Sequence, residues 1–218
     1  MFSMNQYIRE PINAYTHLIG AGLSFIGTIL LLIYGGKGSP LTTTAIVSIT
    51  IFGLSLVALY TASGIYHAVR ANQAVLLKLK KLDHSMIFIL IAGSYTPFCL
   101  LALTGAWQIS IITIIWSLAI IGITLKVFWI NMPRWISTGF YIGMGWVAVL
   151  ALSPLSKALN TGGLTWLALG GIMYTIGGII YGLKKPNISK TFGFHELFHI
   201  FVMLGSACHY WCVFNYVL

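Results

Sequence analysis

The chain has 218 residues, of which 58% are hydrophobic and only 7% are charged, and its mean hydropathy is +0.92. Because a soluble domain is typically about one quarter charged, this composition excludes a water-soluble fold and indicates an integral membrane protein. The formal net charge of +9 does not indicate nucleic-acid binding, because the basic residues are spread between apolar segments and follow a membrane pattern.

Seven apolar segments are long enough to cross a bilayer, since a spanning helix needs about 20 predominantly apolar residues. They are residues 12–34, 43–68, 83–103, 107–128, 135–153, 163–183 and 192–216. Little chain remains outside them. We therefore predict an all-α, polytopic membrane protein, with residues 1–218 forming a single seven-helix transmembrane domain with short loops.

The Lys and Arg residues predict the orientation of this bundle. If successive helices cross in alternate directions, ten basic residues lie on one side and two on the other. The ten are Arg9, Arg70, Lys78, Lys80, Lys81, Lys126, Arg134, Lys184, Lys185 and Lys190, and the two are Lys37 and Lys157. The positive-inside rule then predicts a cytoplasmic N-terminus and an external C-terminus.

The first predicted helix carries polar residues near its cytoplasmic start. Asn13 and His17 are four residues apart and therefore share one helix face. We interpret them as a polar patch that hydrogen-bonds a neighbouring helix. A role of His17 as a metal ligand is the less favoured alternative.

The second and third predicted helices place further polar groups at the cytoplasmic side. The second ends with Ser63 and His67 four residues apart, before a basic loop, Lys78–Lys81, that we interpret as an anchor against anionic headgroups. The third begins with Asp83, one of only three acidic residues. A carboxylate at the edge of the hydrocarbon needs a partner, which is either a loop lysine or a functional site.

The last predicted helix opens with His195-Glu196-Leu197-Phe198-His199. Residues four apart on a helix have Cβ atoms about 5–6 Å apart, so both imidazoles can reach one metal ion. The three cysteines, Cys99, Cys208 and Cys212, form an odd set on apolar helices and indicate packing rather than a disulfide.

The alternating helix directions bring five of these side chains to one depth in the inner leaflet. They are Ser63, His67, Asp83, His195 and His199. The three histidines supply three nitrogen ligands and leave the fourth zinc position for water, as in catalytic zinc sites. Asp83 would hold or deprotonate this water, and Ser63 would orient it or donate to an oxyanion. Histidines that only satisfy one another are the alternative, which three converging side chains and a carboxylate disfavour.

The string His195-Glu196-x-x-His199 also matches the zinc-peptidase helix, in which the glutamate is the general base. Nothing after His199 offers an acidic third ligand, however, and Glu196 can instead point at Lys184, Lys185 or Lys190. A membrane-embedded peptidase is therefore the second-ranked interpretation.

Four motifs in order make the chain resemble the haemolysin III family, which belongs with the progestin and adipoQ receptors and the alkaline ceramidases. The motifs are Pro11-Ile12-Asn13-Ala14-Tyr15-Thr16-His17, Ser63-Gly64-Ile65-Tyr66-His67, Leu82-Asp83-His84-Ser85 with Ala92-Gly93-Ser94-Tyr95-Thr96-Pro97-Phe98, and His195-Glu196-Leu197-Phe198-His199. The resemblance implies a seven-helix bundle with a cytoplasmic N-terminus in the plasma membrane, which would be a bacterial inner or cell membrane. It also implies a zinc ion (Zn2+) near the inner face. The ion would lie on His67, His195 and His199, while Asp83 and Ser63 match the superfamily's other two site positions. Glu196 is not part of the shared pattern.

Better-studied members of this superfamily are hydrolases of lipid amides or receptors associated with such activity. The resemblance therefore implies a zinc-dependent hydrolase of a lipid amide or ester, with membrane lipids as partners and a role in membrane-lipid homeostasis. Two alternatives stay open. One is a non-enzymatic, lipid-sensing receptor or regulator with structural zinc. The other is a pore-forming haemolysin, against which the scarcity of ionisable residues in the middle of the helices argues.

Overall fold

The computed structural model describes residues 7–189 and 191–218. Lys190, one of the ten basic residues counted above, lies outside the described residues. Over the described ranges the chain is all-α, without strands, and seven helical spans are long and apolar enough to cross a membrane. The elements are α1 (Pro11–Tyr34), α2 (Thr43–Ala68), α3 (Gln73–Pro97), the π-helical turn η2 (Phe98–Ala102), α4 (Gly105–Phe128), α5 (Arg134–Gly145), the 3-10 turn η3 (Trp146–Ala151), α6 (Leu152–Ala158), α7 (Thr161–Leu183), α8 (Phe194–Cys212) and the π-helical turn η4 (Val213–Val217).

The seven predicted spans are therefore confirmed, but the start of the third and the end of the fifth were predicted wrongly. The third span begins at Gln73 rather than at residue 83, so Lys78–Lys81 lies in α3 and not in a loop. Asn72 starts this helix, because its side-chain oxygen accepts a hydrogen bond from the Val75 N–H at 3.0 Å. Lys, Leu and Gln are good helix formers, so the helix extends beyond its most apolar part. The fifth span, made of α5, η3 and α6, also ends later than predicted, at Ala158.

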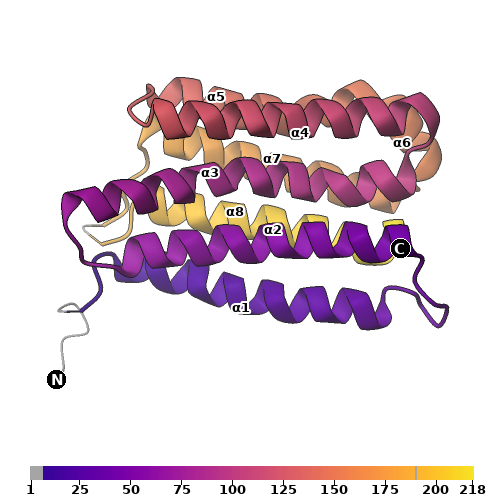
Figure 1. Cartoon of the computed structure of the whole chain (residues 1–218), viewed down its shortest axis with the longest axis horizontal. Coiled ribbons are helices and arrows are strands. Elements are labelled where there is room, and N and C mark those ends of the chain that lie inside the picture. The colour runs from indigo at the N-terminus through magenta and orange to yellow at the C-terminus, as the bar shows by residue number, and fades with distance from the viewer. Residues whose placement is uncertain (1–6, 190) are drawn as a thin grey trace.

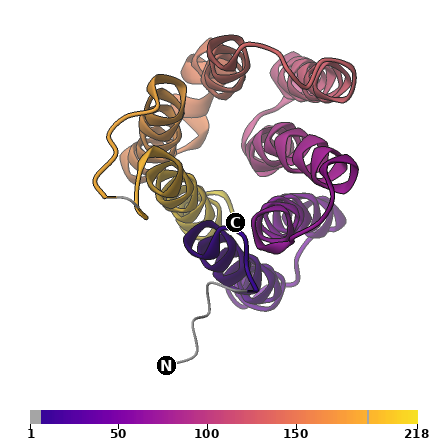
Figure 2. The ribbon, with the colours of Figure 1, turned by 90° about the vertical axis from the view of Figure 1, so that its left-hand side faces the viewer.

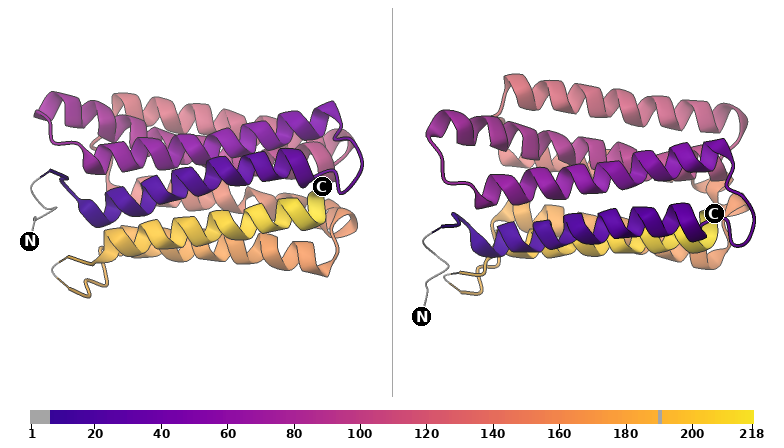
Figure 3. Two further views of the ribbon diagram at one scale, coloured as in Figure 1. Left: turned by 90° about the horizontal axis from the view of Figure 1, so that it is seen from below. Right: turned by 60° about the horizontal axis from the view of Figure 1, so that its bottom comes forward.

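The spans form a ring in which chain neighbours mostly pack together (Figures 1 and 2). α2 packs against α1 and α3, α3 against α4, α5 against α7, and α7 against α8. Figure 3 shows α8 running beside α1, so that the last span contacts the first. The C-terminal half of α2 and the N-terminal halves of α3 and α8 are thereby brought to one end of the bundle.

At this end of the bundle α1, α3, α5 and α8 begin and α2, α4 and α7 end (Figure 1). We call it the basic end because of the Lys and Arg residues that gather there. The described members of the set of ten basic residues belong to these helix ends or to the loops that join them, whereas Lys37 and Lys157 belong to the opposite end. The segregation of charge predicted from the sequence is therefore present in the fold. That the basic end faces the cytoplasm stays a prediction.

Two glycines allow α2 to lie close to both of its neighbours. A Cβ atom at Gly93 of α3 would overlap the side chain of Ser55 on α2, and one at Gly64 of α2 would lie 2.7 Å from Cγ of Leu18 on α1. Such close helix contacts are typical of small residues in membrane bundles. The last turns of α2, where Ser63 and His67 lie, are thus held firmly between α1 and α3.

Candidate metal centre

The structure brings His67 of α2 together with His195 and His199 of α8 at the basic end. One ring nitrogen from each lies within 4.8 Å of the other two. The ring centroids are 4.9 Å apart for His67 and His195, 4.9 Å for His195 and His199, and 5.0 Å for His67 and His199. His67 and His199 are each only 1% exposed. Two helices remote in sequence thus present three imidazoles to one buried point.

These three nitrogens fit a small metal ion. A zinc–nitrogen bond of about 2.0–2.1 Å places tetrahedral ligand nitrogens about 3.4 Å apart. Side-chain rotations that close the widest pair from 4.8 Å by about 1.5 Å would reach this geometry. Imidazole is a common ligand of zinc, copper, iron and nickel, so the donor set alone does not select one of these metals.

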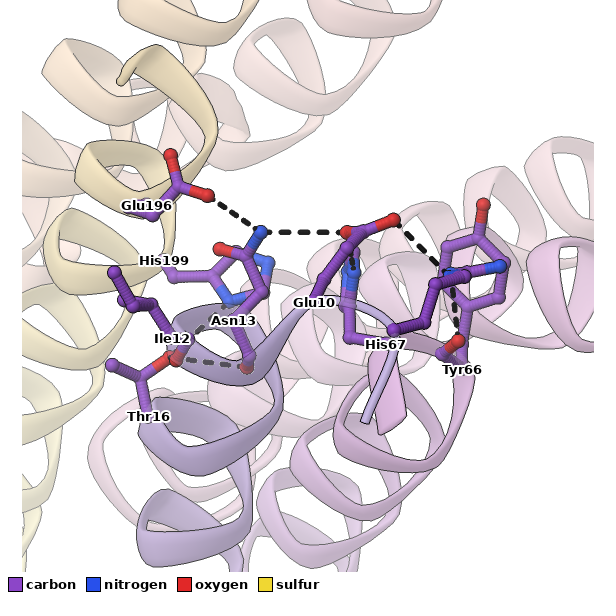
Figure 4. A network of polar contacts seen from close by, with 9 residues as sticks. Glu10, Ile12, Asn13, Thr16, Tyr66, His67, Glu196 and His199 are labelled. Atoms are coloured by element: carbon purple, nitrogen blue, oxygen red, sulfur yellow. Dashed lines mark hydrogen bonds and ion pairs between the residues drawn. The ribbon is translucent and has the colours of Figure 1, made fainter. Parts of the chain in front are cut away.

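Glu10 orients one of the three imidazoles. Its Oε2 lies 2.5 Å from Nδ1 of His67, whereas Nε2 of His67 is buried and has no hydrogen-bond partner among the described residues (Figure 4). With the proton on Nδ1 and donated to the carboxylate, the lone pair of Nε2 faces the other two histidines. This carboxylate–histidine pairing is the arrangement that commonly supports metal-binding histidines.

The segment before α1 places Glu10 there by covering the end of α2. The Arg9 N–H donates to the Ala68 carbonyl at 3.2 Å and the Glu10 N–H to the His67 carbonyl at 3.0 Å, so two carbonyls of the last turn find partners. The Arg9 guanidinium donates to the Tyr66 carbonyl at 2.7 Å and stacks on the Tyr66 ring. The hydrogen bond from His67, helped by the charges of His67 and Arg9, lowers the pKa of Glu10 to about 2 although partial burial opposes the shift.

Sequence reasoning gave Glu10 no role. The available signal was that it is one of three acidic residues and precedes Pro11 at the same end of the bundle as His67. Nothing in the helical periodicity could reveal it, because Glu10 lies outside the helix and reaches His67 through the backbone pairing described above.

The polar face of α1 contacts α8, as predicted for Asn13. Its amide donates to Oε1 of Glu196 at 2.8 Å and to Oε2 of Glu10 at 3.4 Å (Figure 4). The prediction that His17 makes a hydrogen bond is wrong for the described residues, where neither of its ring nitrogens has a partner. Its ring instead stacks on that of His199, with centroids 3.6 Å apart and planes at 9°. This stacking restricts the orientation of the His199 ring.

Glu196 supports the start of α8. Its Oε2 accepts the Gly193 N–H at 2.8 Å, and its Oε1 accepts the Asn13 amide. The expected pairing with Lys184 or Lys185 is wrong, because neither lysine has a carboxylate of the described residues within 4.0 Å. The third candidate, Lys190, lies outside those residues. Both carboxylate oxygens are therefore used in holding the helix that carries His195 and His199.

A cavity of about 610 Å³ lies inside the bundle and meets the histidine cluster. Its lining includes Ser63, His67, Asp83, His195 and His199, all five residues singled out from the sequence. Asp83 and Ser63 are 8% and 2% exposed, and the Asp83 carboxyl interacts with the Ser63 hydroxyl and with His67. A loop lysine as the partner of Asp83 is wrong, since no lysine nitrogen of the described residues lies within 4.0 Å of that carboxylate.

Apolar side chains also line the cavity. Ile87, Leu90, Phe198 and Val202 contribute to it, and it extends along the bundle as far as His209. A cavity lined by both polar and apolar side chains suits a ligand that has both a polar group and a hydrocarbon chain.

The fold and this site define a multi-pass membrane protein with a buried histidine cluster able to hold a metal ion. The chain belongs to the haemolysin-III-related family, whose model matches residues 5–210. It is 40% identical to hemolysin-3 of Bacillus cereus, an alignment that covers 100% of this chain and 96% of the relative. It is 39% identical to the hemolysin-3 homolog of Bacillus subtilis, over 96% of this chain and 95% of the relative. The adiponectin receptor protein of Drosophila melanogaster is 26% identical over 92% of this chain and 49% of its own length.

These relatives are consistent with the family and superfamily that the sequence motifs indicated. Together with the seven apolar helices, the bacterial relatives place the chain in the cell membrane as a multi-pass protein.

Proposed function

We propose that this protein is a zinc-dependent hydrolase that cleaves an amide or ester bond of a membrane lipid. The observation that carries the proposal is the content of one buried cavity. Three imidazoles, the Asp83 carboxyl and the Ser63 hydroxyl line it, together with apolar side chains along its length. Metal ligands, a proton acceptor and a hydrogen-bond donor beside a lipid-compatible space are the parts that hydrolysis of an acyl bond requires.

His67, His195 and His199 would hold the ion, and Glu10 would keep Nε2 of His67 directed toward it. When bound, zinc supplies a Lewis acid for the scissile carbonyl and lowers the pKa of water. Asp83 would accept the proton of the attacking water and return it to the leaving nitrogen or oxygen. Ser63 would donate a hydrogen bond to the oxyanion. The water oxygen bonds to the carbonyl carbon, the bond to nitrogen or oxygen breaks, and the products are a fatty acid and an amine or alcohol.

The direct test compares the lipids of cells that lack the protein with those of cells that express the wild type or Asp83→Asn. We expect the levels of one substrate–product pair of lipids to differ between cells that express the wild type and cells that lack the protein. Cells that express Asp83→Asn should have the same levels as cells that lack the protein. Purified Asp83→Asn should retain its metal, so that the loss is one of chemistry and not of assembly. A variant that reproduces every wild-type lipid difference would remove Asp83 from the mechanism.

A second candidate function is a lipid-sensing receptor or regulator in which zinc is structural. The similarity to a protein named as an adiponectin receptor favours it. In that case chelation would lower the melting temperature of the purified protein, and addition of lipid would raise it, without any turnover to lose. A hydrolase would lose turnover on chelation and regain it with added zinc.

The similarity to proteins named hemolysin-3 favours a pore former as a third candidate. Conductance measured across liposomes that contain the purified protein separates this candidate from the other two. If the protein is a hydrolase, we expect no conductance above that of protein-free liposomes.

A further inference from the structure

Lys126 is a buried cation in the last turn of α4. It is 2% exposed, and its ammonium group donates a hydrogen bond to the Ser137 hydroxyl of α5 at 2.5 Å. The Ser137 hydroxyl accepts a hydrogen bond from one of the three N–H groups of the ammonium ion, and because it is neutral it does not balance the positive charge. Removing an ammonium ion from water is unfavourable unless an opposite charge is close, so an anion is expected beside Lys126.

Two further basic side chains, Lys80 of α3 and Arg134 of α5, line the same cavity as Lys126. The start of α3 lies beside the end of α4, since the Lys81 ammonium group donates to the Val127 carbonyl at 2.6 Å. The Arg134 guanidinium donates to the Tyr181 carbonyl at 3.3 Å and lies over the Tyr181 ring, 4.5 Å from its centre. Three cationic groups from three helices therefore border one space.

The carboxylates of Glu10 and Asp83 also line this cavity, but neither forms an ion pair with one of the three cations among the described residues. Among the described residues, none of Lys80, Lys126 and Arg134 has a carboxylate within 4.0 Å. The chain contains only three acidic residues. Glu10 contacts Arg9 and His67, Glu196 contacts Asn13 and Gly193, and Asp83 interacts with His67 and Ser63.

The depth of these residues indicates what the missing anion is. Lys126 is two residues from the end of its span and Arg134 is the first residue of the next, so both lie where a helix leaves the hydrocarbon for the headgroup layer. Apolar cavity residues such as Ile87, Ile91 and Ile142 follow toward the bundle interior. An anion with attached hydrocarbon chains matches both parts of this lining.

We propose that Lys80, Lys126 and Arg134 form a binding site for the phosphate group of an anionic lipid. Lys and Arg are the side chains that most often bind phosphate, Arg through paired N–H donors and Lys through its point charge. None of these three residues belongs to the histidine cluster, and the site opens on the same cavity. Taken with the proposed hydrolase, on which this step rests, it selects anionic phospholipids over zwitterionic ones as the class of substrate.

Binding of short-chain lipids to the purified full-length protein in an uncharged maltoside detergent tests the proposal. Native mass spectrometry would count bound dioctanoyl phosphatidylglycerol and dioctanoyl phosphatidylcholine, with inorganic phosphate as a competitor. We expect phosphatidylglycerol to bind at least about tenfold more tightly than phosphatidylcholine, and Lys126→Met to weaken it about tenfold, because a charge-assisted contact is lost. Lys126→Arg, which keeps the charge, should retain binding.

Lys78→Met is the matched control, because Lys78 is an exposed lysine on the same helix as Lys80 and at the same end of the bundle. It should leave the affinity for phosphatidylglycerol unchanged. Lys80→Met repeats the test without touching the buried hydrogen bond between Lys126 and Ser137, should Lys126→Met fail to fold.

Equal binding of the two lipids, or wild-type affinity in Lys80→Met and Lys126→Met, would overturn the proposal. If inorganic phosphate at equal concentration displaces phosphatidylglycerol, the site binds free phosphate and not a lipid, and the proposal is wrong. His195→Ala should bind phosphatidylglycerol like the wild type, so that failure of the metal site and failure of the phosphate site are told apart.

Discussion

The carboxylate of Glu10 and the imidazole of His67 meet at 2.5 Å, although 57 residues separate them in the chain. The contact uses Nδ1 of His67 and leaves Nε2 directed at the cluster that His195 and His199 complete. A carboxylate on the far nitrogen fixes the tautomer and the ring orientation of a metal-binding histidine and raises its basicity. We therefore propose that Glu10 is a positioning residue that acts on the candidate metal centre through His67.

We predict that Glu10→Gln lowers the affinity for zinc by about tenfold, because a neutral amide is a weaker acceptor for the imidazole proton. Competition with a chromophoric chelator measures this affinity without any assay of turnover. Thr165→Ala is the control, because the exposed Thr165 hydroxyl donates only within its own helix, to the Thr161 carbonyl at 2.8 Å. Equal affinities for the two variants and the wild type would show that Glu10 does not support the metal site.

Ser63 gives a second prediction, which separates chemistry from assembly. Ser63→Ala should lower turnover of the lipid substrate by about 100-fold, the usual effect of removing one donor to an oxyanion, while zinc content stays unchanged. Ser55→Ala, on the same helix, is the control, because the Ser55 hydroxyl donates to the Phe52 carbonyl. Turnover that falls equally in both variants would indicate a general effect on α2.

The contact between Gly93 and Ser55 predicts a stability effect. Gly93→Ala should destabilise the protein by about 1–3 kcal/mol, because the added methyl group overlaps the Ser55 side chain and forces α2 and α3 apart. Gly143→Ala is the control, since a Cβ atom at Gly143 meets nothing within 4 Å. Thermal unfolding of both variants in the same detergent measures the difference, and equal melting temperatures would count against the packing described for these helices.

The predicted orientation is tested by cysteine labelling in intact cells. After replacement of Cys99, Cys208 and Cys212 by Ala, one new cysteine is placed in an exposed loop at each end, Ser39→Cys or Ala71→Cys. A membrane-impermeant maleimide should label Ser39→Cys in intact cells and Ala71→Cys only after permeabilisation, because the positive-inside rule places the basic end in the cytoplasm. The reverse pattern would invert the topology.

The sequence predicted the spans and the meeting of the site residues because both depend on simple geometry. The length of an apolar segment decides whether it spans, and alternate crossing directions decide which helix ends meet. The end of α2 and the starts of α3 and α8 therefore had to share one side, which brought His67, Asp83 and His195 together.

The remaining features depend on interactions that hydropathy and periodicity do not record. The early start of α3 at Gln73 follows from the Asn72 cap and from helix propensity outside the hydrocarbon. The position of Glu10 follows from backbone hydrogen bonds between the segment before α1 and the last turn of α2. The use of Glu196 as a partner of Asn13 follows from lateral packing of α1 on α8, which no local pattern specifies.

Metal content measured on purified protein tests the central claim most directly. Inductively coupled plasma mass spectrometry should find about one zinc ion per wild-type chain. It should find almost none in His195→Ala, and wild-type content in His84→Ala, which changes a histidine of the same cavity outside the cluster. Stoichiometric zinc retained by His195→Ala would contradict the proposed ligand set.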